Sequence, residues 1–219
     1  MKLLRPTLTQ HLRQNSALIL MGAFCICLLL VRAKLTHSLF YFFLIWNLFL
    51  AYLPLAVSSY IMEKPYLIEN KWRFYPAVII WLLLLPNAPY IITDFIHLKR
   101  ETTVPVWFDV LLLISFSLTG LLFGLKSMKQ MFYILTIQFN YAIVWVVLFF
   151  VNILCGFGIY VGRFLRYNSW DVLHKPLELT QNILYSLVTS PQCVTAWGVT
   201  LGFGTFLFIL FLMYPEIED

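Results

Sequence analysis

The apolar residues of this chain come in long runs, and six of these runs have about the length of a membrane span. They cover about 17–31, 39–61, 74–96, 106–125, 131–161 and 194–214. A hydrocarbon core about 30 Å thick needs roughly 20 consecutive apolar residues in each helix that crosses it. The pattern therefore predicts an all-α polytopic membrane protein with six transmembrane helices, folded as a single membrane domain over residues 1–219.

The segment 163–193 is too polar to cross a membrane, but it has a helical period of its own. Leu177, Ile183, Leu184 and Leu187 recur near helical spacing beside the polar Glu178. This pattern is typical of an amphipathic helix that lies at the membrane surface. We therefore expect an interfacial helix between the fifth and sixth spans.

The first apolar run has two interpretations. Lys2, Arg5 and Arg13 precede it, as positive charges precede the apolar region of a signal peptide. Arg32 and Lys34 follow the run directly, which favours a helix that is retained. We expect a retained first helix, with a cleaved signal peptide as the alternative.

Composition agrees with the membrane prediction. Apolar residues make up 61% of the chain and charged residues 11%, and the mean hydropathy is +0.84, whereas soluble domains are about 45–50% apolar and 25% charged. The net charge of +5 arises from Lys and Arg in short segments between the apolar runs. These charges predict contacts with membrane lipids and no nucleic-acid partner, and their nearly even division between the two sides leaves the orientation open.

Three of the predicted helices contain two glycines one turn apart. The pairs are Gly120/Gly124, Gly158/Gly162 and Gly198/Gly202. Such pairs let helix backbones approach closely in a membrane. We expect the last three helices to pack on one another, and the same faces could hold a membrane-protein partner or a second copy of the chain.

The third apolar run carries a polar stripe in its second half, LLLLPNAPYIITDFIHL. The stripe consists of Asn87, Tyr90, Asp94 and His97. At 100° per residue these four side chains fall within an arc of roughly 80° on one helix face. Pro86 and Pro89 lack amide protons, so we expect the helix to be kinked or locally unwound there. The alternative is a kink satisfied by packing, with the charged residues in the headgroup region.

Alternating spans bring further polar residues to the end where this stripe emerges. We expect one site there, with Asp94, His97 and Asp109 as catalytic acid–base residues. The expected substrate-binding residues are Asn47, Asn87, Tyr90, Arg163, Arg166, Asn168 and Asp171. Guanidinium groups bind phosphate through paired hydrogen bonds, although arginines at helix ends also extend to lipid phosphates non-specifically.

Metal and redox chemistry have little support in the sequence. The spacings Asp94-x-x-His97 and Asp171-x-x-His174 would place a carboxylate and an imidazole on one helix face. The pattern is short, however, and the four cysteines have no CxxC spacing. We expect a hydrogen-bonded polar network without a metal, and the sequence identifies no cofactor.

Three stretches resemble one known family. They are LPNAPYIITDFIHL, the WFD at 107–109, and GIYVGRFLRYNSWDVL at 158–173. These words resemble the bacterial polytopic membrane proteins grouped as the domain-of-unknown-function family numbered 1361, from about the second helix to the sixth. WFD departs from the family's usual WYD by one hydroxyl. The resemblance implies a multi-pass protein of the bacterial inner (plasma) membrane and implies no activity.

Three functions fit these features. The first is a membrane-embedded enzyme or binding protein for a lipid-like molecule with a polar or anionic head. The second is a non-catalytic accessory or assembly subunit of a membrane complex. The third is a small transporter, because broken helices with polar groups mark transport sites, although the ionisable residues here gather at one boundary.

Overall fold

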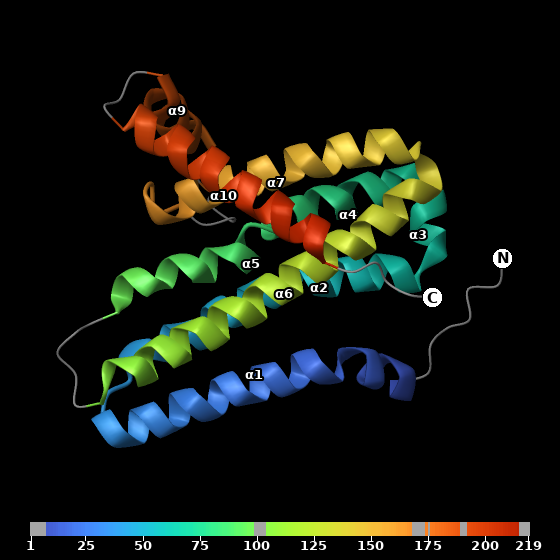
Figure 1. Ribbon diagram of the computed structural model, residues 1–219. Coiled ribbons are helices and arrows are strands. Elements are labelled where there is room, and N and C mark those ends of the chain that lie inside the picture. Colours follow the sequence, from blue (N-terminus) through green and yellow to red (C-terminus); the bar gives the residue numbers. More distant parts are fainter. Residues whose placement is uncertain (1–7, 99–103, 168–173, 175, 189–191, 215–219) are drawn as a thin grey trace.

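The computed structural model describes residues 8–98, 104–167, 174, 176–188 and 192–214, with side chains from Ser16 onward. The helices are α1 (Leu8–Thr36), η1 (Phe40–Phe42), α2 (Phe43–Glu63), α3 (Pro65–Glu69), α4 (Lys71–Leu84), α5 (Asn87–Tyr90), η2 (Ile91–His97), α6 (Val106–Gln138), α7 (Tyr141–Arg163), α9 (Pro176–Val188) and α10 (Cys193–Met213). No strand occurs among these residues, which confirms the all-α prediction (Figure 1).

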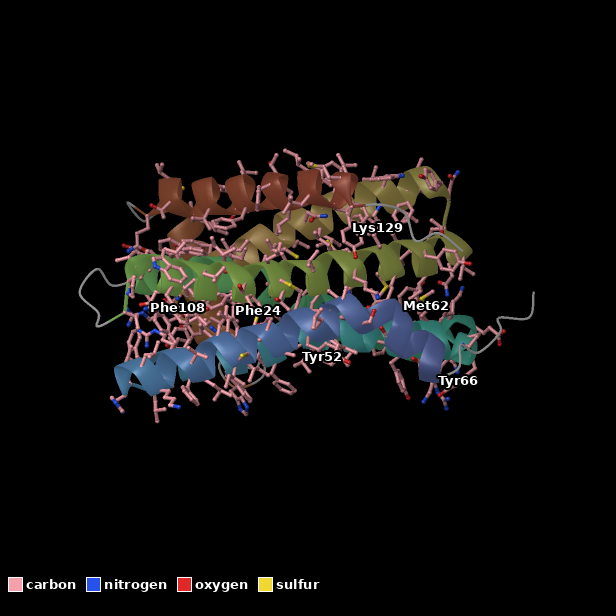
Figure 2. All side chains as sticks on the ribbon, turned by 60° about the horizontal axis from the view of Figure 1, so that its bottom comes forward. Phe24, Tyr52, Met62, Tyr66, Phe108 and Lys129 are labelled. Atoms are coloured by element: carbon pink, nitrogen blue, oxygen red, sulfur yellow. The ribbon has the colours of Figure 1, made fainter. Side chains whose placement is uncertain are left out.

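Six helical stretches are long and apolar enough to cross a membrane. They are Ser16–Thr36, Phe40–Glu63, Lys71–His97, Val106–Gln138, Tyr141–Arg163 and Cys193–Met213. In Figure 2, carbon-rich side chains such as Phe24 and Tyr52 cover the flank of the bundle, while nitrogen and oxygen atoms gather mostly toward its two ends. The prediction of a polytopic membrane protein with six spans is confirmed.

The predicted boundary between the fourth and fifth spans is wrong. The sequence suggested a loop at 126–130, but α6 continues for 33 residues to Gln138, and the chain turns only before Tyr141. Neighbouring helices accommodate the polar residues inside α6. Ser58 of α2 donates a hydrogen bond to Gln130 at 2.7 Å, and the Lys129 ammonium lies 4.6 Å from the centre of the Phe211 ring of α10.

Helix α6 occupies the centre of the bundle. It buries 56% of its most apolar stretch, against 22–39% for the other five spans. Figure 1 shows α1 on one side of α6 and α7 with α10 on the other. Its first half packs with Leu29 and Leu44 of α1 and α2, and its second half packs with Leu148 and Phe211 of α7 and α10. The protein therefore has two apolar clusters joined along one helix.

The third span is broken where the prolines predict it. Helix α4 ends at Leu84, α5 is one turn long, and η2 continues as a 3₁₀ helix to His97. Pro89 cannot donate to the carbonyl of Leu85, which accepts from the amide of Ala88 at 3.1 Å. The Asn87 side chain donates to the carbonyl of Leu84 at 2.8 Å. Local hydrogen bonds thus give the carbonyls of Leu84 and Leu85 partners at the break.

Two glycine pairs hold this broken segment from opposite sides. A Cβ atom on Gly120 of α6 would lie 2.8 Å from the carbonyl oxygen of Ala88, and one on Gly158 of α7 would lie 2.5 Å from Pro86 Cγ. Each position therefore depends on the missing side chain. The last three spans do pack on one another as expected, but the glycine pairs of α6 and α7 both face the segment between α4 and η2.

Helices α7 and α10 do pack closely, but through other glycines. A Cβ on Gly156 of α7 would lie 2.7 Å from the amide nitrogen of Gly204 of α10. By contrast, no atom lies within 4 Å of such a Cβ on Gly198 or Gly202. The predicted contact between α7 and α10 is thus confirmed. The glycine pair Gly198/Gly202 of α10, however, does not form this contact.

The predicted short helix in 163–193 is present as α9. Leu179 and Ser186 are buried, Ile183 and Leu187 are half-buried, and the opposite face is exposed. Its position at the membrane surface remains a prediction.

Candidate functional site

A cavity of about 510 Å³ lies between α2, the broken third span, α7 and α9. Its polar or charged lining side chains are Asn47, Asn87, Tyr90, Asp94, His97, Arg163 and Tyr167. Its apolar lining includes Leu50, Leu82, Leu83, Leu154 and Phe157. This volume lies within the roughly 300–1,000 Å³ typical of small-molecule sites.

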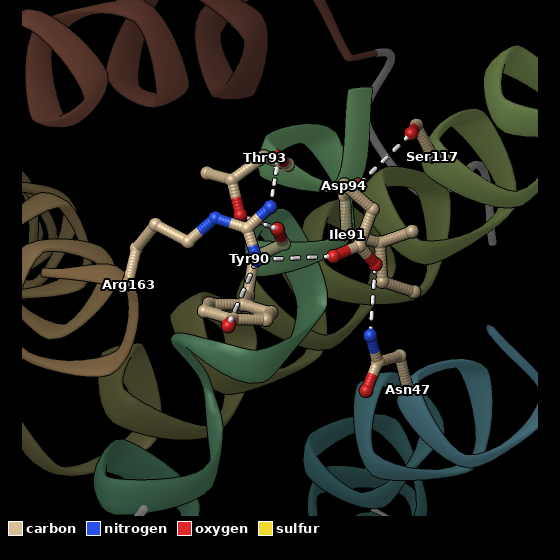
Figure 3. Close-up of polar contacts among 7 residues, drawn as sticks. All are labelled: Asn47, Tyr90, Ile91, Thr93, Asp94, Ser117 and Arg163. Atoms are coloured by element: carbon tan, nitrogen blue, oxygen red, sulfur yellow. Dashed lines mark hydrogen bonds and ion pairs between the residues drawn. The ribbon is translucent and has the colours of Figure 1, made fainter. Parts of the chain in front are cut away.

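Asp94 lies at the centre of the polar end. Only 1% of the residue is exposed, and its Oδ2 accepts a hydrogen bond of 2.8 Å from the Asn47 amide (Figure 3). Residues three apart share a face in a 3₁₀ helix, so Asp94 and His97 both reach the cavity from η2. The predicted common face of these two residues is confirmed.

Arg163 enters this end from the last turn of α7. Its Nη2 donates to the carbonyl of Thr93 at 2.5 Å, and its Nη1 lies 3.4 Å from the Tyr90 hydroxyl and 3.5 Å from Asp94 Oδ1 (Figure 3). The side chain is 16% exposed. Arg163 is thus directed into the protein, which decides against non-specific contact with lipid phosphates for this residue.

His97 is held at the rim of the cavity by aromatic neighbours. Its ring packs edge-on to Phe43 with a centroid separation of 5.2 Å, and its carbonyl accepts a hydrogen bond of 2.9 Å from Tyr41. These contacts fix both the ring and the backbone at the end of η2. The imidazole is therefore positioned beside Asp94 by Phe43 of α2 and Tyr41 of η1.

The apolar part of the cavity extends from the polar end toward the middle of the spans. Arg163 follows Leu154 by nine positions along α7, which corresponds to about 14 Å at 1.5 Å per residue. Trp46, Leu83 and Leu154 line this part while remaining 55%, 43% and 48% exposed on the flank of the bundle. The cavity is therefore partly open toward the region that lipid chains would occupy.

The chain after α7 covers the polar end. The backbone amide of Tyr167 donates to the carbonyl of Val161 at 3.2 Å, which turns the chain back over the helix end. The Tyr167 hydroxyl accepts from Asn182 at 2.7 Å and lies 3.2 Å from Glu178. These contacts hold α9 in place, so that Leu179 contributes to the wall of the cavity.

The structure brings together six of the predicted site residues and separates others. Those that line the cavity are Asn47, Asn87, Tyr90, Asp94, His97 and Arg163. Arg166 is exposed, has a left-handed backbone with φ of 60°, and does not line the cavity. Asn168 and Asp171 lie outside the described residues.

Asp109 belongs to a different contact. It is completely buried at the start of α6 and accepts two hydrogen bonds from Arg32 of α1, at 2.6 and 3.2 Å. The guanidinium also lies 4.2 Å from the centre of the Tyr41 ring. Asp109 faces α1, not the cavity, so its predicted position in the site is wrong.

Sequence reasoning missed Tyr41, Tyr167 and Leu179. Tyr167 stands inside the GRFLRYN stretch, so its place in a distinctive motif was an available signal. Tyr41 and Leu179 carry no comparable signal, because an aromatic at a helix start and a leucine in an amphipathic helix are common. Within the described part of the chain, no three His, Cys, Asp or Glu side chains gather as potential metal ligands.

Comparison with known proteins gives one match. A family model described as a protein of unknown function (DUF1361) matches residues 46–210, from α2 to α10. No curated protein and no solved structure matches the sequence. The matched region contains every residue that lines the cavity except Phe43.

Proposed function

The chain belongs to the DUF1361 family of proteins of unknown function, and from its site we propose that it binds a single amphiphile with a polar head. The head would lie among Asn47, Asp94 and Arg163, and an apolar tail would lie along Leu83 and Leu154. The membrane in question is, on this proposal, the bacterial inner (plasma) membrane, as the family resemblance implies.

One observation carries the proposal: a single cavity joins a charged end to an apolar wall that is partly open toward lipid. Ionisable residues inside membrane spans are costly and usually serve a site. A soluble polar ligand would leave the apolar wall unfilled, and a hydrocarbon would leave Asp94 and Arg163 without polar ligand contacts. An amphiphile matches both parts.

The test is to fill the apolar part of the cavity. Leu83→Trp places an indole at a lining position, whereas Ile79→Trp makes the same change one turn earlier on α4, at a residue that is 57% exposed and does not line the cavity. If the indole excludes about three methylene groups, each worth about 0.8 kcal/mol, affinity falls about 50-fold.

The measurement is titration of the detergent-purified protein with short-chain phospholipids, followed by intrinsic fluorescence or calorimetry. Leu83→Trp should weaken binding, and Ile79→Trp should leave it near that of the unmodified chain. Equal binding by both variants and the unmodified protein would contradict the proposal.

Other functions remain predictions that this experiment separates. An enzyme would in addition convert the bound amphiphile, with Asp94 and His97 as the acid–base pair. A transporter would move solute or protons across liposomes, and Asp94→Asn would abolish that flux. An accessory subunit would bind a partner protein and show no amphiphile binding sensitive to Leu83→Trp.

A further inference from the structure

We propose that the head group taken by this cavity is zwitterionic, with its anionic group on Arg163 and its cationic group on Asp94. This inference rests on the proposed function and specifies the class of amphiphile. The anionic group can be a phosphate or a carboxylate, since both accept paired hydrogen bonds from a guanidinium. The cationic group is an ammonium that can donate to a carboxylate.

The charges that line the cavity are balanced. Among the described residues that line the cavity, Asp94 and Arg163 supply the two fixed charges, and they have opposite signs. An anionic head would be attracted by Arg163 and repelled by Asp94, and a cationic head would meet the reverse. A head with both signs makes two favourable contacts and leaves neither buried charge without compensation.

The contact between these two charges is loose. Arg163 and Asp94 approach to 3.5 Å, whereas the buried ion pair of Arg32 with Asp109 closes to 2.6 Å. The shorter hydrogen bond of Arg163, at 2.5 Å, goes to the carbonyl of Thr93 and does not depend on Asp94. An ammonium can therefore replace the guanidinium at Asp94 Oδ1 while Arg163 keeps its anchor.

Side chains next to each charge keep hydrogen-bonding capacity for a ligand. On the anionic side, the Tyr90 hydroxyl accepts from Arg163, which leaves its own proton to donate to a phosphate or carboxylate. On the cationic side, Asn47 uses its amide nitrogen for Asp94, so its carbonyl oxygen faces away from that bond and can accept from an ammonium. The amide of Asn47 thus offers one further acceptor near Asp94, and the hydroxyl of Tyr90 offers one further donor near Arg163.

The experiment compares soluble amphiphiles whose heads carry different charges. The probes are dihexanoyl phosphatidylethanolamine, dihexanoyl phosphatidylglycerol, decylamine and an uncharged alkyl glucoside, titrated into the purified full-length protein. The unmodified chain should bind the zwitterionic probe at least about tenfold more tightly than the other three. Phosphoethanolamine without acyl chains should bind more weakly than the lipid, which distinguishes a lipid head from a free phosphate ester.

Two variants should change this preference in opposite directions. Asp94→Asn removes the repulsion of anions and should make phosphatidylglycerol the preferred probe, while Arg163→Gln should shift the preference to decylamine. The matched control is Arg73→Gln, an exposed arginine at the start of α4 that does not line the cavity, and it should keep the zwitterionic preference.

The outcomes separate the two proposals. If no amphiphile binds the unmodified chain, the proposed function itself fails. If amphiphiles bind but the anionic, cationic or uncharged probe is preferred, the zwitterionic assignment is overturned and the proposed function stands. A variant that does not fold affects only its own arm, because the comparison of probes on the unmodified chain decides the assignment alone.

Discussion

A methyl group at Gly158 should separate the two elements that form the wall of the cavity. In Gly158→Ala the new Cβ would lie 2.5 and 2.6 Å from Pro86 Cγ and Cβ. The new Cβ is fixed to the helix backbone and the proline atoms belong to a ring, so both sides of this contact are rigid. Carbon atoms pack at about 3.5–4.0 Å, so α7 and the broken span must part by about 1 Å. Overpacking of this kind costs about 1–3 kcal/mol in the free energy of unfolding.

The matched comparison is Gly202→Ala, where no atom lies within 4 Å of the added methyl group. Both variants gain the same helix propensity, up to about 1 kcal/mol, so the difference between them isolates the steric cost. At about 2–4 °C per kcal/mol for a chain of this length, Gly158→Ala should melt about 2–12 °C below Gly202→Ala in detergent. Equal melting temperatures would refute the close approach of Gly158 to Pro86.

Three further predictions follow from single contacts. Arg32→Met should lower the free energy of unfolding by about 3–5 kcal/mol in denaturant titrations, because it leaves the Asp109 carboxylate buried without a cation. Adding Asp109→Leu should recover most of the loss, and a double variant as unstable as the single one would contradict this. Asn47→Leu should cost about 1–3 kcal/mol by thermal melting, since Asp94 Oδ2 loses its donor, and an unchanged melting temperature would count against that bond. Tyr167→Phe should speed amide hydrogen exchange in α9 by about tenfold and leave the other helices unchanged, because one hydroxyl links the two segments; exchange at the original rate would show that the hydroxyl does not hold α9.

The end of the helix bundle at which each polar residue lies could be predicted from the sequence. Short connections between spans force alternation, so Asn47, Asp94 and Arg163 had to emerge at the same end. The direction in which each residue faces around its helix could not be predicted in this way. Asp109 lies at the same end but faces α1, because its partner Arg32 is supplied by a helix whose rotation no local pattern fixes.

The length of α6 is a second feature that could not be predicted from the sequence. Lys126, Lys129 and Gln130 resemble a loop when each residue is judged by its own hydropathy. In the structure the Lys129 ammonium lies over an aromatic ring of α10, and Gln130 accepts a hydrogen bond from Ser58 of α2. These partners come from distant parts of the chain, so no window along α6 contains the information that keeps it helical.

The partners of the glycines are a third feature that could not be predicted from the sequence. The spacing of Gly158 and Gly162 correctly indicated a close approach, but it did not identify the partner, which is a proline segment and not another glycine pair. Gly156 and Gly204 belong to no such spacing pair, yet a Cβ on either of them would clash with the other helix. A motif of small residues therefore predicts that space is available on a helix face and not which element fills it.

The buried pair of Arg32 and Asp109 also sets an order of events during synthesis. The two residues are 77 positions apart, and ribosomes add about 5–20 residues per second, so Asp109 is made about 4–15 s after Arg32. Throughout that interval the guanidinium can contact lipid headgroups, water and the Tyr41 ring, but it has no carboxylate partner at Asp109. The pair can close only after the second and third spans have been made, so this tie between α1 and α6 forms late, although α1 is translated before those spans.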